Sequence, residues 1–177
     1  MTLITFLLIL CLFILIILSG FLSGSETALT ATSKPRILLK YKKGDKKAKF
    51  VLKILDNLDN VISSLLLSNN LVNILASSLA TAVLYDIFGI TGIFYATLIM
   101  TVLIVVFAEI LPKTYSLNRP TRTSLQIAPI VFYLSKILYP FIFLINIIVK
   151  QIFRIQKKDN KLEDQQSEEE LQGVIEM

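Results

Sequence analysis

The chain has 177 residues, of which 54% are apolar, and it carries a formal charge of +5 without any histidine. This composition is too apolar for a soluble domain of this length, and it indicates one integral membrane domain. The single cysteine, Cys11, lies in the first apolar run, where we expect it to face lipid or to pack. Disulfide frameworks, zinc clusters and catalysis by Cys/His or Ser/His/Asp sets are therefore excluded, and we expect a protein that is not an enzyme.

The first apolar segment, residues 3–25, contains no charged side chain and is long enough to cross a bilayer as a helix. Its length and its uncharged start distinguish it from a signal peptide. It leads into Ser19–Thr27, a stretch of small and hydroxyl residues that permits close helix approach and hydrogen bonds between helices.

A basic loop follows, in which residues 34–53 contain nine Lys or Arg side chains and one acid, Asp45. The positive-inside rule places this loop in the cytoplasm and the N-terminus outside. Apolar residues within the loop predict short amphipathic juxtamembrane helices at about 34–56 on the inner leaflet. The basic clusters suggest that this region binds the headgroups of anionic lipids and does not bind a nucleic acid.

The second predicted span, residues 60–85, is uncharged but holds several amides and hydroxyls near its centre. Asn69 and Asn73 are four residues apart and share one helix face, as Ser64 and Ser68 also do. Amides are costly in lipid, so these side chains must face protein, water or a ligand. Hydrogen bonding between helices is the alternative to a binding site.

The third predicted span, residues 88–111, ends with a carboxylate followed by a proline. A glutamate at membrane depth is costly unless it faces a cavity or a partner, so Glu109 is a candidate ligand. Pro112 has no N–H, so it should break the helix and leave the Ala108 carbonyl without its helical donor. Together these two oxygens predict part of a cation site.

A fourth apolar stretch, residues 125–149, is interrupted by Lys136, Pro129 and Pro140, and both of its flanks are basic. A crossing would place one basic flank outside, against the charge rule. We therefore predict a bent or interfacial pair of juxtamembrane helices at about 123–153 on the cytoplasmic side. A true fourth crossing is the competing interpretation.

Three motifs resemble those of the CorC and cyclin M (CNNM) magnesium transporter family: Ser23–Leu29, Leu67–Asn73 and Phe107–Lys113. They occur in the family's order and on its three helices, and the resemblance covers residues 1–155. It implies an all-α, dimeric integral membrane domain with three transmembrane helices and a belt of cytoplasmic-side juxtamembrane helices. The polar residues 156–177 resemble the family's linker to a cytosolic CBS-pair module, which this sequence does not contain.

The resemblance also implies an ion site between the three helices. Carried over by position, the ligands are Ser23, Asn69, Asn73, Glu109 and the carbonyl of Ala108. Ser25 and Ser68 are additional candidates. Glu26 lies near the cytoplasmic end of the first helix, where it could line an ion exit or be a solvated charge at the level of the headgroups. The family often has glycine at the positions of Ser68 and Ala108, so the methyl group of Ala108 affects how closely the helices approach.

All of these candidate ligands are hard oxygens, which select magnesium, calcium, manganese or sodium over zinc or copper. A site with one carboxylate and neutral oxygens should bind magnesium weakly, which suits an ion that must leave again. The resemblance implies export of a dehydrated magnesium ion coupled to sodium entry, in the cell membrane. The alternative is a membrane sensor or scaffold that binds magnesium without transporting it and regulates other transporters.

Overall fold

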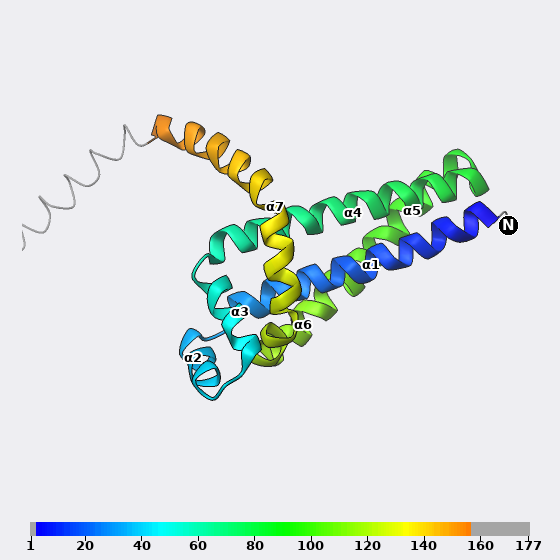
Figure 1. Ribbon diagram of the computed structural model, residues 1–177. Helices are drawn as coiled ribbons and strands as arrows, with labels where there is room; N and C mark the ends of the chain where they lie inside the picture. Colours follow the sequence, from blue (N-terminus) through cyan, green and yellow to red (C-terminus); the bar gives the residue numbers. More distant parts are fainter. Residues whose placement is uncertain (1–2, 157–177) are drawn as a thin grey trace, which may run out of the picture. The chain divides into compact units, whose positions relative to one another are not determined.

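The computed structural model describes residues 3–156, with side chains up to Val149, and these residues form helices and no strand. Figure 1 shows the arrangement of these elements. The elements are α1 (Leu3–Thr30), α2 (Lys34–Lys42), α3 (Lys46–Leu55), α4 (Leu58–Phe88), α5 (Ile90–Val102), the π-helix η1 (Leu103–Ile110), α6 (Leu111–Asn118) and α7 (Pro120–Gln156). The predicted all-α fold is confirmed. The predicted polar linker lies outside the described residues beyond Gln156.

The short helices α2 and α3 occupy the basic loop, where the sequence predicts amphipathic helices. Pro35 lies in the first turn of α2, where a missing N–H is tolerated. Asp45 caps α3 by accepting a hydrogen bond from the Lys47 N–H at 2.9 Å. These start signals explain why one basic segment forms two helices.

The turn between α4 and α5 depends on Gly89, which has a φ of +63°. Its N–H donates to the Tyr85 carbonyl at 2.8 Å, which closes the last turn of α4. Glycine adopts a positive φ without a steric penalty, so the chain reverses at this residue. The helix from Ile90 onward can then return along α4.

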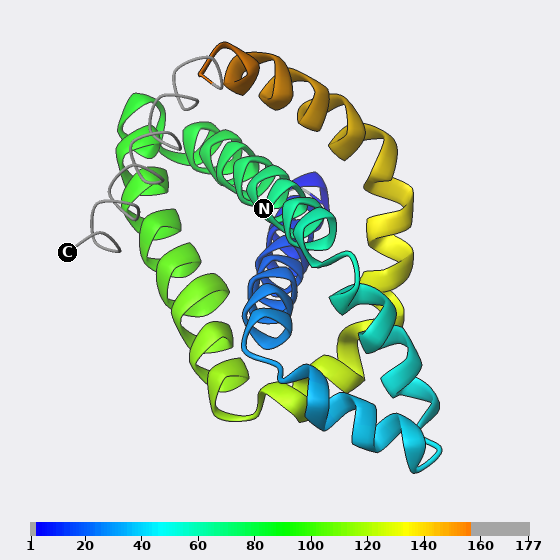
Figure 2. The same ribbon diagram turned by 90° about the vertical axis from the view of Figure 1, so that its left-hand side faces the viewer.

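Helix α1 lies between the other two long helices. It contacts α4 on one side and η1 and α6 on the other, an arrangement visible end-on in Figure 2. Residues of α1 therefore form two separate interfaces, and the candidate ligands have to be assigned to one or the other.

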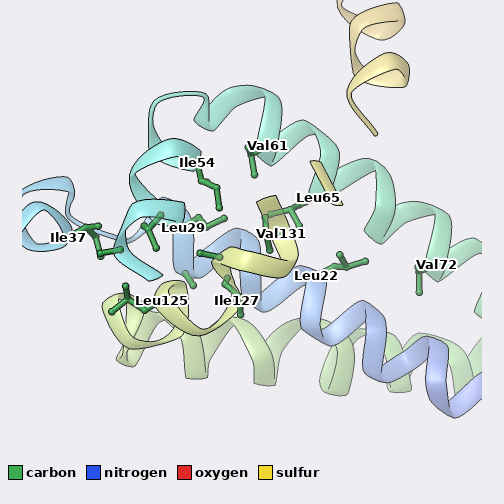
Figure 3. Packing of buried hydrophobic residues seen from close by; sticks show 14 residues of the cluster. Leu22, Leu29, Ile37, Ile54, Val61, Leu65, Val72, Leu125, Ile127 and Val131 are labelled. Carbon is green, nitrogen blue, oxygen red and sulfur yellow. The ribbon is translucent and has the colours of Figure 1, made fainter. Parts of the chain in front are cut away.

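The main hydrophobic cluster gathers near the junction of α1 with α2 and of α3 with α4 (Figure 3). It combines the C-terminal half of α1, the N-terminal half of α4, both short helices and the first turns of α7. Its buried members are Leu22, Ala28, Leu29, Ile37, Ala48, Val51, Ile54, Val61, Leu65, Val72, Leu125, Ile127, Ala128 and Val131. The first turns of α7 therefore pack on the basic-loop end of the bundle.

Within residues 3–156, four helices are long and apolar enough to cross a membrane, one more than the three predicted. By this criterion of length and composition the fourth candidate is Pro120–Val149, and the protein is a multi-pass membrane protein. The predicted helix pair at 123–153 is wrong in one respect, because α7 is a single continuous helix despite Pro129 and Pro140. An interior proline removes a backbone hydrogen bond and crowds the carbonyl four residues earlier, and the packing of the first turns of α7 against α2 and α3 offsets this cost at Pro129. The described chain divides into two compact units, with the boundary after Leu138 inside α7.

Candidate cation site

The interface between α1 and α4 is polar at its centre. The Ser19 hydroxyl lies 2.8 Å from Oδ1 of Asn69 and 2.6 Å from Oδ1 of Asn73. Asn69 is buried and Asn73 half-buried. The sequence places the two amides on one helix face, and the structure brings that face against α1.

These three oxygens share a single hydroxyl proton. A serine hydroxyl can donate one hydrogen bond, so it satisfies Asn69 or Asn73 but not both. Rotating one amide by 180° would present its NH2 group to Ser19 and remove the shortage. A cation among the three oxygens would remove it without any rotation. The arrangement is therefore satisfied either by one rotated amide or by a cation among the three oxygens.

Ser23 lies one turn further along α1, on the same face as Ser19. Within the described part of the chain, its Oγ is the buried side-chain polar atom that has no hydrogen-bond partner. An unpaired buried hydroxyl costs about 1–3 kcal/mol, so such atoms call for a specific explanation. A ligand that binds this oxygen beside the Ser19–Asn69–Asn73 cluster would provide one.

A neighbouring face of α1, about 100° around the helix from Ser19 and Ser23, makes a close contact with the third long helix through two glycines, Gly20 and Gly24. A Cβ added to Gly24 would lie 3.1 Å from the Ser116 hydroxyl and 3.3 Å from Cβ of Pro112. A Cβ added to Gly20 would lie 3.2 Å from Cγ of Pro112. This spacing of small residues lets two membrane helices approach closely. It holds Pro112 directly against α1.

The sequence predicts that the helix breaks at Pro112. This prediction is wrong, because the helix continues through α6 to Asn118. The accommodation appears as η1, the π-helix immediately before it. Its register is given by the Leu111 N–H, which donates to the carbonyl of Val106, five residues earlier. π-Helical segments are rare and occur frequently at functional sites.

The π register changes which carbonyl faces the missing N–H of Pro112. Five residues before Pro112 is Phe107, so this carbonyl receives no donor from position 112 in that register. The Phe107 oxygen also faces α1, at 3.4 Å from a Cβ added to Gly20. Phe107 therefore joins Ala108 as a candidate backbone ligand. Ala108 itself is fully buried, with its Cα 3.8 Å from the same added Cβ.

Glu109 follows these residues in η1 and is half-buried. Among residues 3–149, no side chain forms an ion pair with it, since the ion pair of this part of the chain joins Lys34 to Asp56. The described residues also contain no group of three or more His, Cys, Asp or Glu side chains able to hold a metal. Glu109 would thus act with neutral oxygens and not within a carboxylate cluster.

The three further candidates differ in their surroundings. Glu26 is half-buried and shares the α1 face of Ser19, one turn beyond Ser23. Ser68 is buried and donates to the Ser64 carbonyl at 2.8 Å, which leaves only its lone pairs for a ligand. Ser25 donates to the Phe21 carbonyl at 2.6 Å, and two residues from Ser23 it points about 200° away around the helix.

Sequence reasoning missed Ser19, the residue that contacts both amides. The signal that could have found it is its spacing of four from Ser23, which matches the spacing of Asn69 and Asn73. Phe107 was also missed, because its candidacy depends on a π register that the sequence does not reveal.

Residues 10–177 match the family described as the cyclin M transmembrane N-terminal domain. The chain belongs to this family. The motif resemblance of the three helices is thereby confirmed, and the chain is a cyclin M-type membrane domain.

Relatives of this cyclin M-type domain occur in bacteria and in plants. A UPF0053 protein of Haemophilus influenzae is 36% identical over 165 residues, which cover 93% of this chain and 39% of the relative. The UPF0053 inner membrane protein YfjD of Escherichia coli is 35% identical over 160 residues, covering 89% and 37%. A DUF21 domain-containing chloroplastic protein of Arabidopsis thaliana, At1g55930, is 28% identical over 162 residues, covering 92% and 25%. The chain thus spans about 40% or less of the length of these relatives.

Proposed function

We propose that this domain binds and transports magnesium, exporting it in exchange for sodium that enters the cell. The observation that supports this most directly is the meeting of Ser19, Asn69 and Asn73 around one shared proton. The unpaired hydroxyl of Ser23 lies on the same face of α1. Membership of the cyclin M family is consistent with a transporter and with no enzymatic activity.

The proposed ligands are Ser19, Ser23, Asn69, Asn73 and Glu109, with backbone oxygens of Phe107 or Ala108. Gly20 connects the two groups, because it follows Ser19 in α1 and packs beside Phe107 and Ala108 of η1. This adjacency supports a site that takes oxygens from all three long helices at one level of α1. Hydroxyl, amide, carboxylate and carbonyl oxygens suit a hard cation, and magnesium or sodium can each be held this way.

We propose three membrane crossings, with the start of α7 at the cytoplasmic surface and the N-terminus outside the cell membrane. The buried residues of α7 up to Val131 belong to the cluster with α2 and α3, and the partly buried Phe132 and Leu134 pack against it. From Ser135 to Val149 only 15 residues remain, about 22 Å of helix at 1.5 Å per residue, short of a hydrocarbon core of about 30 Å. The basic flanks on both sides of this segment favour the same placement.

The proposed partners are a second copy of the chain, anionic lipids at the basic helices, and a cytosolic CBS-pair module in the longer protein. Asn70 supports the second copy, because it is exposed in the middle of α4. An amide facing lipid lacks hydrogen-bond partners, whereas a neighbouring helix can supply them.

The test is calorimetric titration of magnesium into detergent-purified protein, comparing the wild type with Glu109→Gln. We expect binding in the wild type and a loss of at least about tenfold in the variant, since the charge that offsets the cation is removed. Asp59→Asn, which removes an exposed carboxylate in the first turn of α4, is the matched control and should bind like the wild type.

Ion flux in sealed vesicles then distinguishes transport from sensing. Magnesium efflux that depends on an opposing sodium gradient and disappears in Glu109→Gln supports the exchanger. Binding without flux in any gradient would establish the sensor or scaffold instead. Equal binding by Glu109→Gln and the wild type would refute the proposed site.

A further inference from the structure

A second feature lies between α4 and the α5–η1 helix, away from the candidate cation site, and its lining is mostly apolar. It is a cleft of about 340 Å³. We call it the hydroxyl cleft, because four of its lining residues carry hydroxyl groups. These residues are Ser77, Thr81, Thr97 and Thr101. At about 30 Å³ per molecule the cleft has room for about ten waters.

The hydroxyl cleft continues the polar face of α4 beyond the cation site. Ser77 lies four residues after Asn73 and Thr81 lies four residues after Ser77, so each step is one turn and about 6 Å. This direction leads toward Gly89, the end of the bundle opposite the basic helices. In the proposed topology that end is extracellular, so the cleft lies between the cation site and the outer surface.

The hydroxyls present acceptor oxygens to the cleft. Thr81 donates its proton to the Ser77 carbonyl at 2.8 Å. Thr97 donates to the Ile93 carbonyl at 3.0 Å, and Thr101 donates to the Thr97 carbonyl at 2.7 Å. With these protons used within their own helices, the lone pairs remain available. The free lone pairs of the three threonines can coordinate a cation or accept hydrogen bonds from water, and they offer no proton to an anion.

An apolar layer separates the cleft from α1. Met100 and Ile104 line the cleft and also belong to a small cluster with Ala76 and Ala80 of α4. Leu12 and Leu15 of α1 pack against the same cluster. An ion in the cleft would therefore have to displace these side chains in order to reach the face of α1 that carries Ser19.

We propose that the hydroxyl cleft is an outer waiting site for a monovalent cation that retains part of its water shell, with Met100 and Ile104 as the gate to the inner site. No charged side chain lines the cleft. Magnesium gives up its water reluctantly and is poorly compensated by neutral hydroxyls, whereas sodium demands less. This inference rests on the proposed exchange, because it assigns an entry route to the incoming ion.

The test uses the full-length protein in sealed vesicles, with Cys11→Ala and any other cysteines removed. A single Ser77→Cys is treated from the outer side with a cationic, membrane-impermeant methanethiosulfonate. We expect modification in choline and protection by sodium. When the sodium concentration is four times the Kd of sodium for the cleft, the rate of thiol modification should fall about fivefold, because only unoccupied clefts react. Ser78→Cys, at an adjacent exposed position outside the cleft, is the matched control and should react equally in both salts.

A second pair of variants tests the oxygens themselves. Thr101→Val keeps the shape of the side chain and should raise the sodium concentration required for protection of Ser77→Cys several-fold. Thr91→Val should not change it, because Thr91 is exposed and lies outside the cleft. Three results would each overturn the inference. Ser77→Cys could fail to react, it could react at the same rate in sodium as in choline, or magnesium could protect it at lower concentrations than sodium.

These outcomes are separate from those of the proposed function, because thiol modification requires no magnesium binding and no flux. Sodium protection at position 77 together with unchanged magnesium binding in Glu109→Gln would retain the outer site and reject the inner one. Magnesium binding that depends on Glu109, with no sodium protection at position 77, would do the reverse.

Discussion

The two sides of α1 meet their neighbours in different ways. On the side of α4, hydroxyl and amide groups face one another, and one buried hydroxyl, that of Ser23, has no partner. On the side of η1 and α6, Gly20 and Gly24 leave only enough room for Pro112 and Ser116. The first interface leaves hydrogen-bonding capacity unused, whereas the second is filled by protein.

This difference separates two roles within a single helix. The glycine interface fixes the position of η1, and with it Glu109, by close contact. The polar interface then supplies oxygens at the same level of α1. Substitutions on the glycine side should therefore reduce stability first, and substitutions on the polar side should reduce ion binding first.

The largest expected effect comes from Gly24→Leu. Its side chain would overlap Pro112 and Ser116, whose atoms lie 3.1–3.4 Å from an added Cβ. Overpacking of this kind costs about 1–3 kcal/mol and occasionally more. We expect a loss at or above the upper end, measured as the thermal unfolding midpoint in detergent. Cys11→Leu enlarges an exposed position on the same helix and should leave that midpoint unchanged. An unchanged midpoint in Gly24→Leu would show that the glycine contact is not tight.

Ser19→Ala should produce the next largest effect, and it acts on both properties. The substitution removes the hydroxyl that contacts Asn69 and Asn73. Leaving buried polar groups unpaired costs about 1–3 kcal/mol, so stability should fall and magnesium affinity should drop about tenfold. Thr30→Ala removes an exposed hydroxyl elsewhere on α1 and serves as the control. Wild-type affinity in Ser19→Ala would remove Ser19 from the ligand set.

Ser23→Ala sharpens the comparison because binding and stability should change in opposite directions. Removing an unpaired hydroxyl should leave the free energy of unfolding unchanged or raise it by up to about 1 kcal/mol, while magnesium affinity falls several-fold.

Ser25→Ala is the converse control. It breaks the bond to the Phe21 carbonyl and should lower stability by about 0.5–1.5 kcal/mol with no change in affinity. Calorimetry and thermal unfolding on both variants check this pattern, and a parallel response would contradict it.

The smallest effect is expected at an ion pair outside both interfaces. Lys34 and Asp56 are 2.7 Å apart, but each side chain is 60% exposed. Exposed pairs contribute about 0–1 kcal/mol, so Asp56→Asn should shift the unfolding midpoint little and leave magnesium binding unchanged. A large shift would indicate that this end of the bundle is held together by charge and not mainly by the hydrophobic cluster.

Much of this arrangement could be predicted because the bilayer limits what the sequence can do. Long uncharged runs predict the helices, and the spacing of Asn69 and Asn73 predicts their common face. A lone carboxylate at membrane depth identifies Glu109 as a residue that needs a partner. These are local patterns, and each can be interpreted from a few neighbouring residues.

The parts that could not be predicted depend on contacts between distant segments. A serine in a membrane helix commonly bonds to its own backbone, as Ser25 does, so the spacing of Ser19 from Ser23 does not reveal that Ser19 contacts Asn69 and Asn73. Pro112 signals a disturbance, but whether the helix breaks or adopts a π register depends on its packing against Gly20 and Gly24. The continuity of α7 through Pro129 likewise follows from the contacts of its first turns with α2 and α3.

The proposed exchange would have an electrical consequence, because the proposed cation site contains a single carboxylate, Glu109. With Glu109 ionised and neutral oxygens around it, a magnesium-loaded site carries a net charge of about +1, and a sodium-loaded site is close to neutral. A membrane potential acts on the first with about 2.3 kcal/mol per elementary charge for each 100 mV and hardly acts on the second. In a cell whose interior is negative, outward movement of the magnesium-loaded site is thus opposed by the voltage, while the sodium-loaded site returns without that cost.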